Sequence, residues 1–292
     1  MEEFFTECKL IAIDIDGTLL TPDLQITPRT RNAIQQAQSM GIVVTLATAR
    51  RYFSTMAIAA ELDIELPLII YDGALIVNHP AQTILAGQPL QAQVALQAVE
   101  IMARHAVQPI VQPYECMLEE VWTGPAEGDN PELATYIALS GNRLRRLPYT
   151  TICSGQTELL RVVAFSSEET LQVLLPEISA LDCSWHMISR GSYGSAELSI
   201  MSPGCSKASG VSTLAAYYHI PLAQVMAIGD NYNDLEMLNA VGWGVAMGQA
   251  PAAVKAAAKA VTATNLEEGV ALAIENYALA RLATSEITLL AD

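Results

Sequence analysis

The chain has 292 residues, of which 51% are apolar, and a formal net charge of −16. This length suits two domains, or one domain with an insertion, and the apolar fraction argues against a disordered chain. The 31 acidic residues against 15 basic ones argue against nucleic acid or an anionic membrane as a partner. The five cysteines form no CxxC pair and the first residues lack a basic leader segment, so we expect a reduced, cytoplasmic protein. Composition predicts no oligomeric state.

Strands and helices alternate along the first eighty residues. Thr27-Pro28 opens the first helix, and Gly41 ends it. This spacing predicts right-handed βαβ units and a parallel sheet. The expected strands cover 9–15, 42–48 and 66–71, and the expected helices cover 28–40 and 52–62.

The pattern changes after the Asp72-Gly73 turn. Two short strands near 75–77 and 83–86 could form a hairpin, and a long helix follows near 89–105. The strands after this helix alternate between polar and apolar residues, which suits an antiparallel sheet with one wet face. They are expected near 110–112, 117–122, 159–165, 185–189 and 196–201, with two shorter helices among them.

After Gly204 the βαβ spacing resumes. The predicted fold is α/β: a doubly wound parallel-sheet core of Rossmann-like type, interrupted by an α+β insertion of ordinary domain size. We assign the core to 1–82 and 190–292, and the insertion to 83–189. The expected elements of this last part are helices at 206–218, 235–240, 252–259 and 267–281 and strands at 225–228 and 244–247.

Two aspartates, Asp14 and Asp16, stand at the end of the first strand. Ligands of open α/β sheets bind just beyond the carboxyl ends of the strands. Two carboxylates so close together repel each other and resist desolvation, so they require a cation. An apolar strand that delivers both to this edge therefore indicates chemistry as well as folding.

Three further segments place polar groups in similar positions. Thr48 ends the second strand, Lys207 stands where the core resumes, and Asp230 ends a later strand. Carboxylates without histidine or cysteine neighbours favour a hard cation, and Mg²⁺ suits phosphate chemistry best. Mg²⁺, Lys207 and Thr48 would then face the charge of a phosphoryl group in transfer. Asp14 can attack phosphorus, and Asp16 can protonate the leaving oxygen and later deprotonate water.

These four segments, in this order, resemble the motifs of the haloacid dehalogenase-like phosphatases. The runs Asp14-Ile-Asp-Gly-Thr-Leu-Leu20 and Gly229-Asp-Asn-Tyr-Asn-Asp234 are similar to its Cof-type subfamily in particular. The resemblance covers nearly the whole chain, and it implies that the insertion is a mobile cap over the substrate.

The roles implied by this resemblance are carried over position by position. Asp14 is the nucleophile, and Asp16 is the acid/base. The metal ligands are Asp14, Asp230 and Asp16, the last through its backbone carbonyl. Thr48, Lys207 and Asn233 are the phosphate-binding residues. The supporting residues are Asp234, Ala49 and Arg50.

The chain departs from the family pattern at two positions. Ala49 replaces the glycine of the Thr-Gly-Arg run that is usual in the family. Asp72 replaces the asparagine of the usual Asn-Gly-Ala run. We expect Asp72 to add a negative charge near the rim, which could alter the choice of substrate. The insertion also holds five arginines, which we expect on a solvated face, with steering of anionic substrates as the alternative. They are Arg143, Arg145, Arg146, Arg161 and Arg190.

The predicted function is Mg²⁺-dependent hydrolysis of phosphomonoesters through an aspartyl-phosphate. The expected substrate is a small phosphorylated metabolite, with sugar phosphates favoured. Two alternatives stay open: a phosphotransferase or phosphomutase on the same core, and a catalytically silent module that binds a phosphorylated ligand. The sequence does not identify the substrate, because the residues that set specificity would lie in the insertion.

Overall fold

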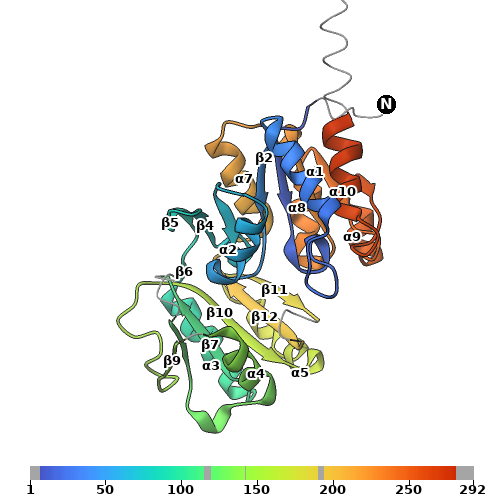
Figure 1. Cartoon of the computed structure of the whole chain (residues 1–292). Coiled ribbons are helices and arrows are strands. Elements are labelled where there is room, and N and C mark those ends of the chain that lie inside the picture. Colours follow the sequence, from blue (N-terminus) through green and yellow to red (C-terminus); the bar gives the residue numbers. More distant parts are fainter. Residues whose placement is uncertain (1–6, 115–119, 142, 190–193, 281–292) are drawn as a thin grey trace, which may run out of the picture. The chain divides into compact units, whose positions relative to one another are not determined.

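The computed structural model of the chain describes residues 7–114, 120–141, 143–189 and 194–280. These residues form two compact units (Figure 1). Residues 7–87 and 206–280 form the first unit, and residues 88–205 form the second. The predicted boundaries, 82/83 and 189/190, both lie earlier. They differ because β5 (Thr83–Gly87) pairs with a strand of the first unit, whereas β12 (Ala196–Met201) pairs with strands of the second.

The first unit contains a parallel sheet in the order β15-β14-β13-β1-β2. In β1, Leu10 lies opposite both Val225 of β13 and Val43 of β2, so β1 is an interior strand of the sheet. Strands that are buried on both faces read as continuous apolar runs, as these do. The strands are β1 (Leu10–Ile13), β2 (Val43–Leu46), β13 (Val225–Gly229), β14 (Trp243–Ala246) and β15 (Ala260–Val261).

A small antiparallel sheet continues from β2. Strand β3 (Leu68–Ile70) reaches β2 through a parallel bridge between Ile69 and Ala47. Strand β4 (Leu75–Asn78) pairs with β3 on one side and with β5 on the other, so the predicted hairpin is confirmed.

Helices cover this sheet, which gives the predicted α/β class. Helices α7, α8 and α9 share an apolar cluster with β1 and β13, while α1 contacts β2 and α10. The Thr27 hydroxyl caps α1 by accepting the Thr30 N–H at 3.2 Å, and Pro28 occupies the first turn. The helices are α1 (Pro28–Ser39), α2 (Tyr52–Glu61), α7 (Lys207–Tyr217), α8 (Leu235–Ala240), α9 (Ala252–Ala257) and α10 (Gly269–Ala273).

The closing helix, predicted over 267–281, differs from the expectation. The α-helix ends at Ala273 and continues as π-helix over Ile274–Leu279. Residue 281 lies outside the described residues. No helix within the described ranges is long and apolar enough to cross a membrane.

The second unit is built on a sheet of order β11-β12-β10-β7-β8-β9, with β6 beside β10. Its pairs are antiparallel, as predicted, except for the parallel pair β8–β9. The strands are β6 (Leu90–Gln91), β7 (Pro109–Pro113), β8 (Glu120–Thr123), β9 (Arg143–Arg146), β10 (Glu158–Ser166), β11 (Ser184–Ile188) and β12. The helices are α3 (Ala92–Arg104), α4 (Pro131–Ser140), α5 (Glu168–Gln172) and α6 (Leu175–Ile178).

Several elements of this unit differ from the prediction. Strand β9 was not expected. Helix α3 begins later than residue 89 because Leu90–Gln91 pairs with β10 instead. The strand predicted over 117–122 overlaps β8, but residues 117–119 lie outside the described part of the chain.

The expected solvated arginine face is wrong for Arg161. Its side chain is buried, and Nε donates to Gln112 Oε1 at 2.6 Å, with Glu197 at 3.8 Å. Arg143 and Arg145 are exposed, as predicted. Exposed Arg146 forms an ion pair with Asp129, and Arg190 lies outside the described residues.

Candidate active site

The candidate site lies at the carboxyl ends of the central strands of the first unit. Asp14 follows β1 directly, and its backbone N–H donates to Ile228 O of β13 at 3.0 Å. This hydrogen bond extends the strand pairing by one residue, so it determines where Asp14 leaves the sheet. The Asp14 side chain is buried at the edge where open α/β sheets bind ligands.

The turn after Asp14 is a wide one. Ile15–Leu19 forms one turn of π-helix, in which the Leu19 N–H donates to Asp14 O at 3.2 Å. Gly17 in this turn has φ of +84°, and a Cβ there would lie 2.4 Å from Asp230 Oδ2. Glycine therefore satisfies both a left-handed backbone and a close approach of the Asp230 carboxylate.

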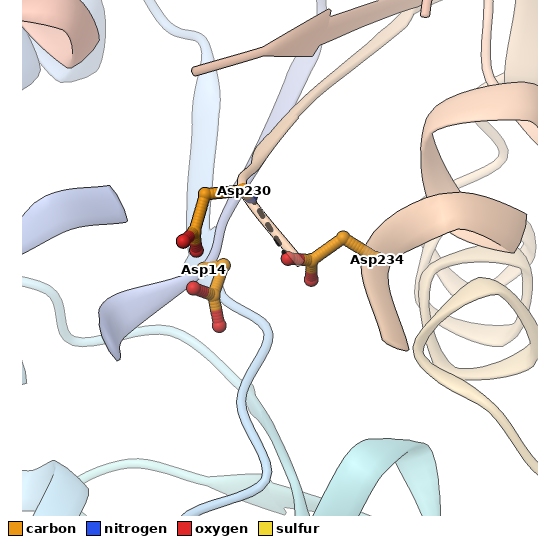
Figure 2. A group of neighbouring side chains, drawn as sticks. All are labelled: Asp14, Asp230 and Asp234. Carbon is orange, nitrogen blue, oxygen red and sulfur yellow. Dashed lines mark hydrogen bonds between the residues drawn. The ribbon is translucent and has the colours of Figure 1, made fainter. Parts of the chain in front are cut away.

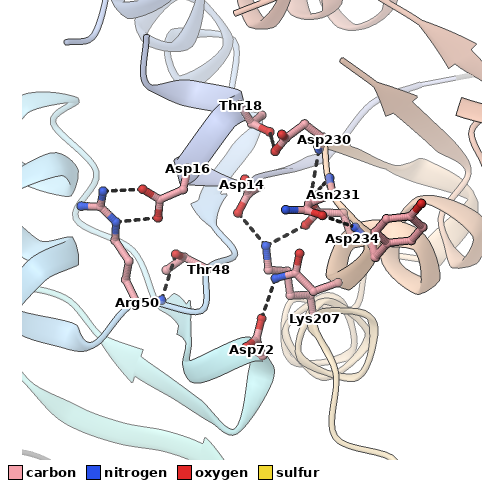
Figure 3. Close-up of polar contacts among 12 residues, drawn as sticks. Asp14, Asp16, Thr18, Thr48, Arg50, Asp72, Lys207, Asp230, Asn231 and Asp234 are labelled. Atoms are coloured by element: carbon pink, nitrogen blue, oxygen red, sulfur yellow. Dashed lines mark hydrogen bonds and ion pairs between the residues drawn. The ribbon is translucent and has the colours of Figure 1, made fainter. Parts of the chain in front are cut away.

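Lys207 begins α7, where the Ser206 hydroxyl accepts the Ser209 N–H at 3.3 Å. The Lys207 side chain is only 1% exposed. Its ammonium donates to Asp14 Oδ1 at 2.6 Å and to Asp234 Oδ1 at 2.7 Å (Figure 3). One buried cation therefore joins the first and the last of the predicted motifs.

Opposite charges keep Lys207 protonated. Burial by itself would lower the pKa of this ammonium, but the charges of Asp14, Asp234 and Asp72 outweigh burial and raise the pKa above its ordinary value. Lys207 is consequently a permanent positive charge at neutral pH.

Asp234 anchors the loop that carries Asp230. Asp234 Oδ2 accepts the backbone N–H groups of Asp230 and Asn231, both at 3.0 Å. From the other side, the Thr18 hydroxyl donates to Asp230 Oδ1 at 3.0 Å. These contacts hold the Asp230 carboxylate beside the turn that follows β1.

The site contains a cluster of three carboxylates. Asp14, Asp230 and Asp234 bring oxygens within 4.8 Å of one another (Figure 2). Burial raises the pKa of Asp14 above its usual range, with Lys207 opposing this shift and Asp234 adding to it. Burial and the Asp234 charge raise the pKa of Asp230 to about 6. Such groups ionise easily only beside a cation, and oxygen donors suit a hard divalent ion, so these residues fit a metal site.

Within this cluster, Asp14 and Asp230 are the stronger candidates for metal ligands. Both oxygens of Asp234 already accept hydrogen bonds, from Lys207 and from the loop N–H groups. The side chain of Asp16 is not part of the cluster, although the predicted contribution of Asp16 is its backbone carbonyl. We therefore assign Asp234 to support, the role that the sequence predicted for it.

Asp16 is directed to Arg50 (Figure 3). Arg50 Nε donates to Asp16 Oδ2 at 2.7 Å, and Arg50 Nη2 donates to Oδ1 at 2.6 Å. The side chains of Asp16 and Arg50 are 36% and 17% exposed. This two-point ion pair adds a second cation to the site, at a residue that the sequence analysis treated only as support.

The residues after the second strand form a local turn. Thr48 is buried, and its Oγ1 accepts the Arg50 N–H at 3.1 Å. Its carbonyl oxygen accepts the Asp72 N–H at 2.9 Å, which joins this turn to the end of β3. Ala49 lies between Thr48 and Arg50. The structure thus places Thr48 at the same edge as Asp14, and its contact with phosphate stays a prediction.

The expectation that Asp72 lies near the rim of the site is wrong. It is fully buried, and its Oδ1 accepts a hydrogen bond from Asn233 Nδ2 at 2.9 Å. The side chain turns inward because its backbone has φ of +54° and its N–H is bound to Thr48 O. Asn233, predicted to bind phosphate, directs its amide to Asp72 in this arrangement.

Sequence reasoning missed two residues of the site, Thr18 and Asn231. Each lies inside a motif that was recognised, directly beside or near an aspartate with an assigned role. A hydroxyl at Thr18 could have been linked to Asp230 only by knowing that the two strand ends meet, and that follows from the pairing of β1 with β13.

Comparisons with known proteins give a consistent result. A profile of haloacid dehalogenase-like hydrolases matches residues 11–274. The chain is 29% identical to 5-amino-6-(5-phospho-D-ribitylamino)uracil phosphatase YitU of Bacillus subtilis (strain 168), over 93% of this chain and 98% of the relative. It is 26% identical to pyridoxal phosphate phosphatase YbhA of Escherichia coli (strain K12), over 92% and 98%. A solved structure of a haloacid dehalogenase-like hydrolase from B. subtilis matches with a TM-score of 0.76 and 27% identity, over 91% of this chain and 99% of its own.

The chain therefore belongs to the haloacid dehalogenase-like hydrolases, and the resemblance predicted from its four motifs is confirmed. The two relatives described above are named phosphatases, and the chain is an enzyme of that class.

Gly17 offers a test of the metal site. The substitution Gly17→Ala is expected to raise the dissociation constant for Mg²⁺ at least about tenfold, because the new Cβ displaces the Asp230 carboxylate. Titration calorimetry measures this affinity. Gly41→Ala is the matched control, since Gly41 has φ of +80° with no atom within 4 Å of its Cβ position. The control should lose about 1 kcal/mol of stability through backbone strain and keep its affinity; equal affinities in the two variants would contradict the assignment.

Proposed function

We propose that the chain hydrolyses phosphomonoesters of a small metabolite through a phosphoaspartate at Asp14. One observation carries this proposal: buried Lys207 holds one oxygen of buried Asp14 at 2.6 Å, at the ligand-binding edge of the sheet. A second acid, Asp16, follows two residues later. A fixed nucleophile, a fixed cation and a nearby acid are the groups that this reaction needs.

The reaction would take place in two steps. First, Asp14 Oδ2 forms a bond to phosphorus while the bond from phosphorus to the ester oxygen breaks, and Asp16 gives that oxygen its proton. Second, a water molecule attacks phosphorus, Asp16 takes the water proton, and the bond from phosphorus to Asp14 breaks. Inorganic phosphate leaves, and both carboxyl groups return to their starting states. Before the first step, Asp16 must exchange its contact with Arg50 for a proton taken from solvent; it gives this proton to the ester oxygen and regains one from the attacking water.

Other side chains would bind the phosphoryl group. Lys207, which stays protonated, would face the negative charge that spreads over the equatorial oxygens. Thr48 and Asn233 are proposed as further phosphate ligands. Asp14, Asp230 and the backbone carbonyl of Asp16 would hold Mg²⁺, which when bound offsets the carboxylate charge and polarises the phosphoryl oxygens.

The proposed substrate is a small phosphorylated metabolite, with sugar phosphates as the favoured class. The names of the two relatives, phosphatases of a ribityl phosphate compound and of pyridoxal phosphate, support a small organic phosphate. We propose that the second unit, residues 88–205, acts as a cap that closes over the substrate and sets specificity.

The test is a screen of phosphorylated sugars, nucleotides and cofactors in the presence of Mg²⁺, with release of inorganic phosphate as the readout. Protein carrying Asp14→Asn, at the same concentration, gives the background. We expect kcat/KM to rank one class of ester well above the others, and a chelator to abolish turnover. Transfer to a second sugar without phosphate release would indicate a phosphotransferase. Turnover no higher than the background for every ester would leave only a phosphate-binding module.

Stabilisation by Mg²⁺ is expected to depend on pH. The pKa of Asp230 is about 6 in the folded protein and near 4 in an unfolded chain. Below pH 4 the group is protonated in both states, and as pH rises through 6 its ionisation destabilises the metal-free protein. Below pH 6, Mg²⁺ must displace a proton, so its affinity falls.

The rise in melting temperature on adding Mg²⁺ should therefore be larger at pH 7 than at pH 5. Thermal unfolding with and without a chelator measures this difference. Asp230→Asn should remove most of it, because the variant has no carboxylate to protonate. An equal rise at both pH values in the unaltered protein would contradict the prediction.

A further inference from the structure

Two polar side chains from the carboxyl-terminal part of the first unit bind the turn that follows Asp14. Gln249 lies three residues after β14, and Asn265 lies four residues after β15. Gln249 Nε2 donates to Gly17 O, and Asn265 Nδ2 donates to Leu20 O at 2.8 Å. The first of these carbonyl groups is in the middle of the turn, and the second is directly after it.

Gln249 and Asn265, together called the clamp, are bound to each other. Gln249 Oε1 accepts the Asn265 backbone N–H at 3.2 Å, so both ends of the Gln249 amide have partners. The two segments that carry the clamp are also in close contact. The Gly248 N–H donates to Ala263 O at 2.9 Å, and a Cβ at Gly248 would lie 2.8 Å from Thr264 N. The clamp therefore has a fixed position beside the turn.

The turn needs this support most at Asp16 and Gly17. Asp16 has φ of −81° and ψ of 115°, and Gly17 has φ of +84° and ψ of −9°, so neither residue has helical backbone angles. The hydrogen bonds that close the turn join its two ends, residues 14–15 and 19–20. Because glycine has the widest choice of backbone conformations, a hydrogen bond to the Gly17 carbonyl restrains the residue that steric effects restrict least.

Two functional groups depend on the conformation of Gly17. Asp16, the proposed acid, precedes it directly, so a rotation at Gly17 changes the direction of Asp16 relative to the rest of the turn. Thr18 follows it and donates to Asp230 Oδ1 at 3.0 Å. The Asp230 carboxylate also approaches Gly17 so closely that a Cβ there would lie 2.4 Å from Asp230 Oδ2. A change in the Gly17 backbone would thus displace both the acid and a candidate metal ligand.

We propose that Gln249 and Asn265 are positioning residues that hold the turn so that Asp16 reaches the leaving oxygen of the ester. This inference rests on the proposed function, in which Asp16 gives that oxygen its proton. The clamp acts through backbone carbonyl groups of the turn. It supports this proton transfer more than the attack by Asp14, because the Asp14 N–H is already fixed by Ile228 O of β13.

The experiment compares kcat/KM for two esters, an alkyl phosphate from the screen and p-nitrophenyl phosphate. An alkoxide requires a proton to leave, whereas p-nitrophenolate leaves without one. The ratio kcat/KM covers only the steps up to cleavage of the ester bond, so it isolates this proton transfer. Gln249→Met and Asn265→Ala should lower kcat/KM for the alkyl ester on the order of tenfold or more, and that for p-nitrophenyl phosphate by less than about threefold.

Gln249→Glu separates donation to Gly17 from packing. Glutamate has the shape of glutamine and can still accept the Asn265 N–H, but its carboxylate has no proton to donate to Gly17 O. This variant should therefore change the ratio of the two kcat/KM values in the same direction as Gln249→Met.

Gln38→Met is the matched control. Gln38 is on α1, and its Nε2 also donates to a backbone carbonyl, that of Asp63 at 3.4 Å, after the end of α2. The control should keep the ester ratio of the unaltered protein. The same unaltered ratio in the folded variants of Gln249 and Asn265, whether or not their activity falls, would overturn the proposal.

Mg²⁺ affinity distinguishes failure of this inference from failure of the proposed function, because titration calorimetry needs no turnover. Hydrolysis by the unaltered protein, with an unaltered ester ratio in the variants, would reject the clamp alone. If the unaltered protein hydrolyses no ester, the proposed function is rejected. A rise of about tenfold in the dissociation constant for Mg²⁺ in Gln249→Met would then support the clamp, since Asp230 loses a fixed neighbour, and an unchanged constant would reject it.

Discussion

Asp14→Asn is expected to reduce phosphate release by about four orders of magnitude or more, because it removes the nucleophile of the proposed first step. The asparagine amide has the shape of the carboxyl group, but it is too weak a nucleophile to form the acyl phosphate. The fold should persist, since Lys207 keeps its hydrogen bond to Asp234 at 2.7 Å. Steady-state kinetics with the best ester from the screen measures the loss.

A covalent trap makes this prediction sharper. Acid quenching during turnover of a substrate labelled on phosphorus should leave label on the peptide that contains Asp14, and none in the Asp14→Asn protein. Asp23→Asn is the control, because Asp23 is an exposed carboxylate of the same segment. Activity of Asp14→Asn within tenfold of the unaltered protein would exclude Asp14 as the nucleophile.

Lys207→Met is expected to lower the free energy of unfolding by about 3–5 kcal/mol in the absence of metal. Lys207 is 1% exposed and donates to both Asp14 and Asp234, so its removal leaves two buried carboxylates without their cation. Methionine keeps much of the side-chain volume, and the effect therefore reports charge more than packing. Urea unfolding in a chelator measures the loss.

Addition of Mg²⁺ should recover part of this stability, because a second cation then faces the same carboxylates. Lys9→Met is the control: Lys9 forms an exposed ion pair with Glu7 at 3.3 Å, and its loss should change stability by no more than about 0.5 kcal/mol. A Lys207→Met protein as stable as this control would show that the buried carboxylates are protonated without the lysine.

The elements that were predicted well have local signals. Helix α1 begins and ends within a residue of its predicted bounds, because Thr27-Pro28 and Gly41 are signals that a short window contains. Strand β9 has no such signal: Arg143–Arg146 contains a single apolar residue, and it becomes a strand by pairing with β8. The domain boundary near 205 was misplaced for the same reason, since β12 belongs to the second unit through its pairing with β10.

The candidate site shows the same difference between features with a local sequence signal and features that depend on tertiary contacts. The residues that motifs identify, such as Asp14, Lys207 and Asp230, do lie together in the structure. The Asp16–Arg50 ion pair and the burial of Asp72 could not be predicted, because both depend on where separate turns meet in three dimensions. Residue type gave the chemistry of the site, and tertiary contacts decided how its charges are paired.

The order of strands in the first unit has a consequence for synthesis of the protein. A nascent chain emerging from the ribosome carries β1 and β2 long before β13, which lies beside β1 in the finished sheet. Until residues 225–229 emerge, one edge of β1 has no partner strand, and unpaired apolar edges favour association between chains. Residues 88–205 are continuous in sequence and can fold meanwhile. We infer that the newly made protein most needs a chaperone while only the amino-terminal half of its core has been synthesised.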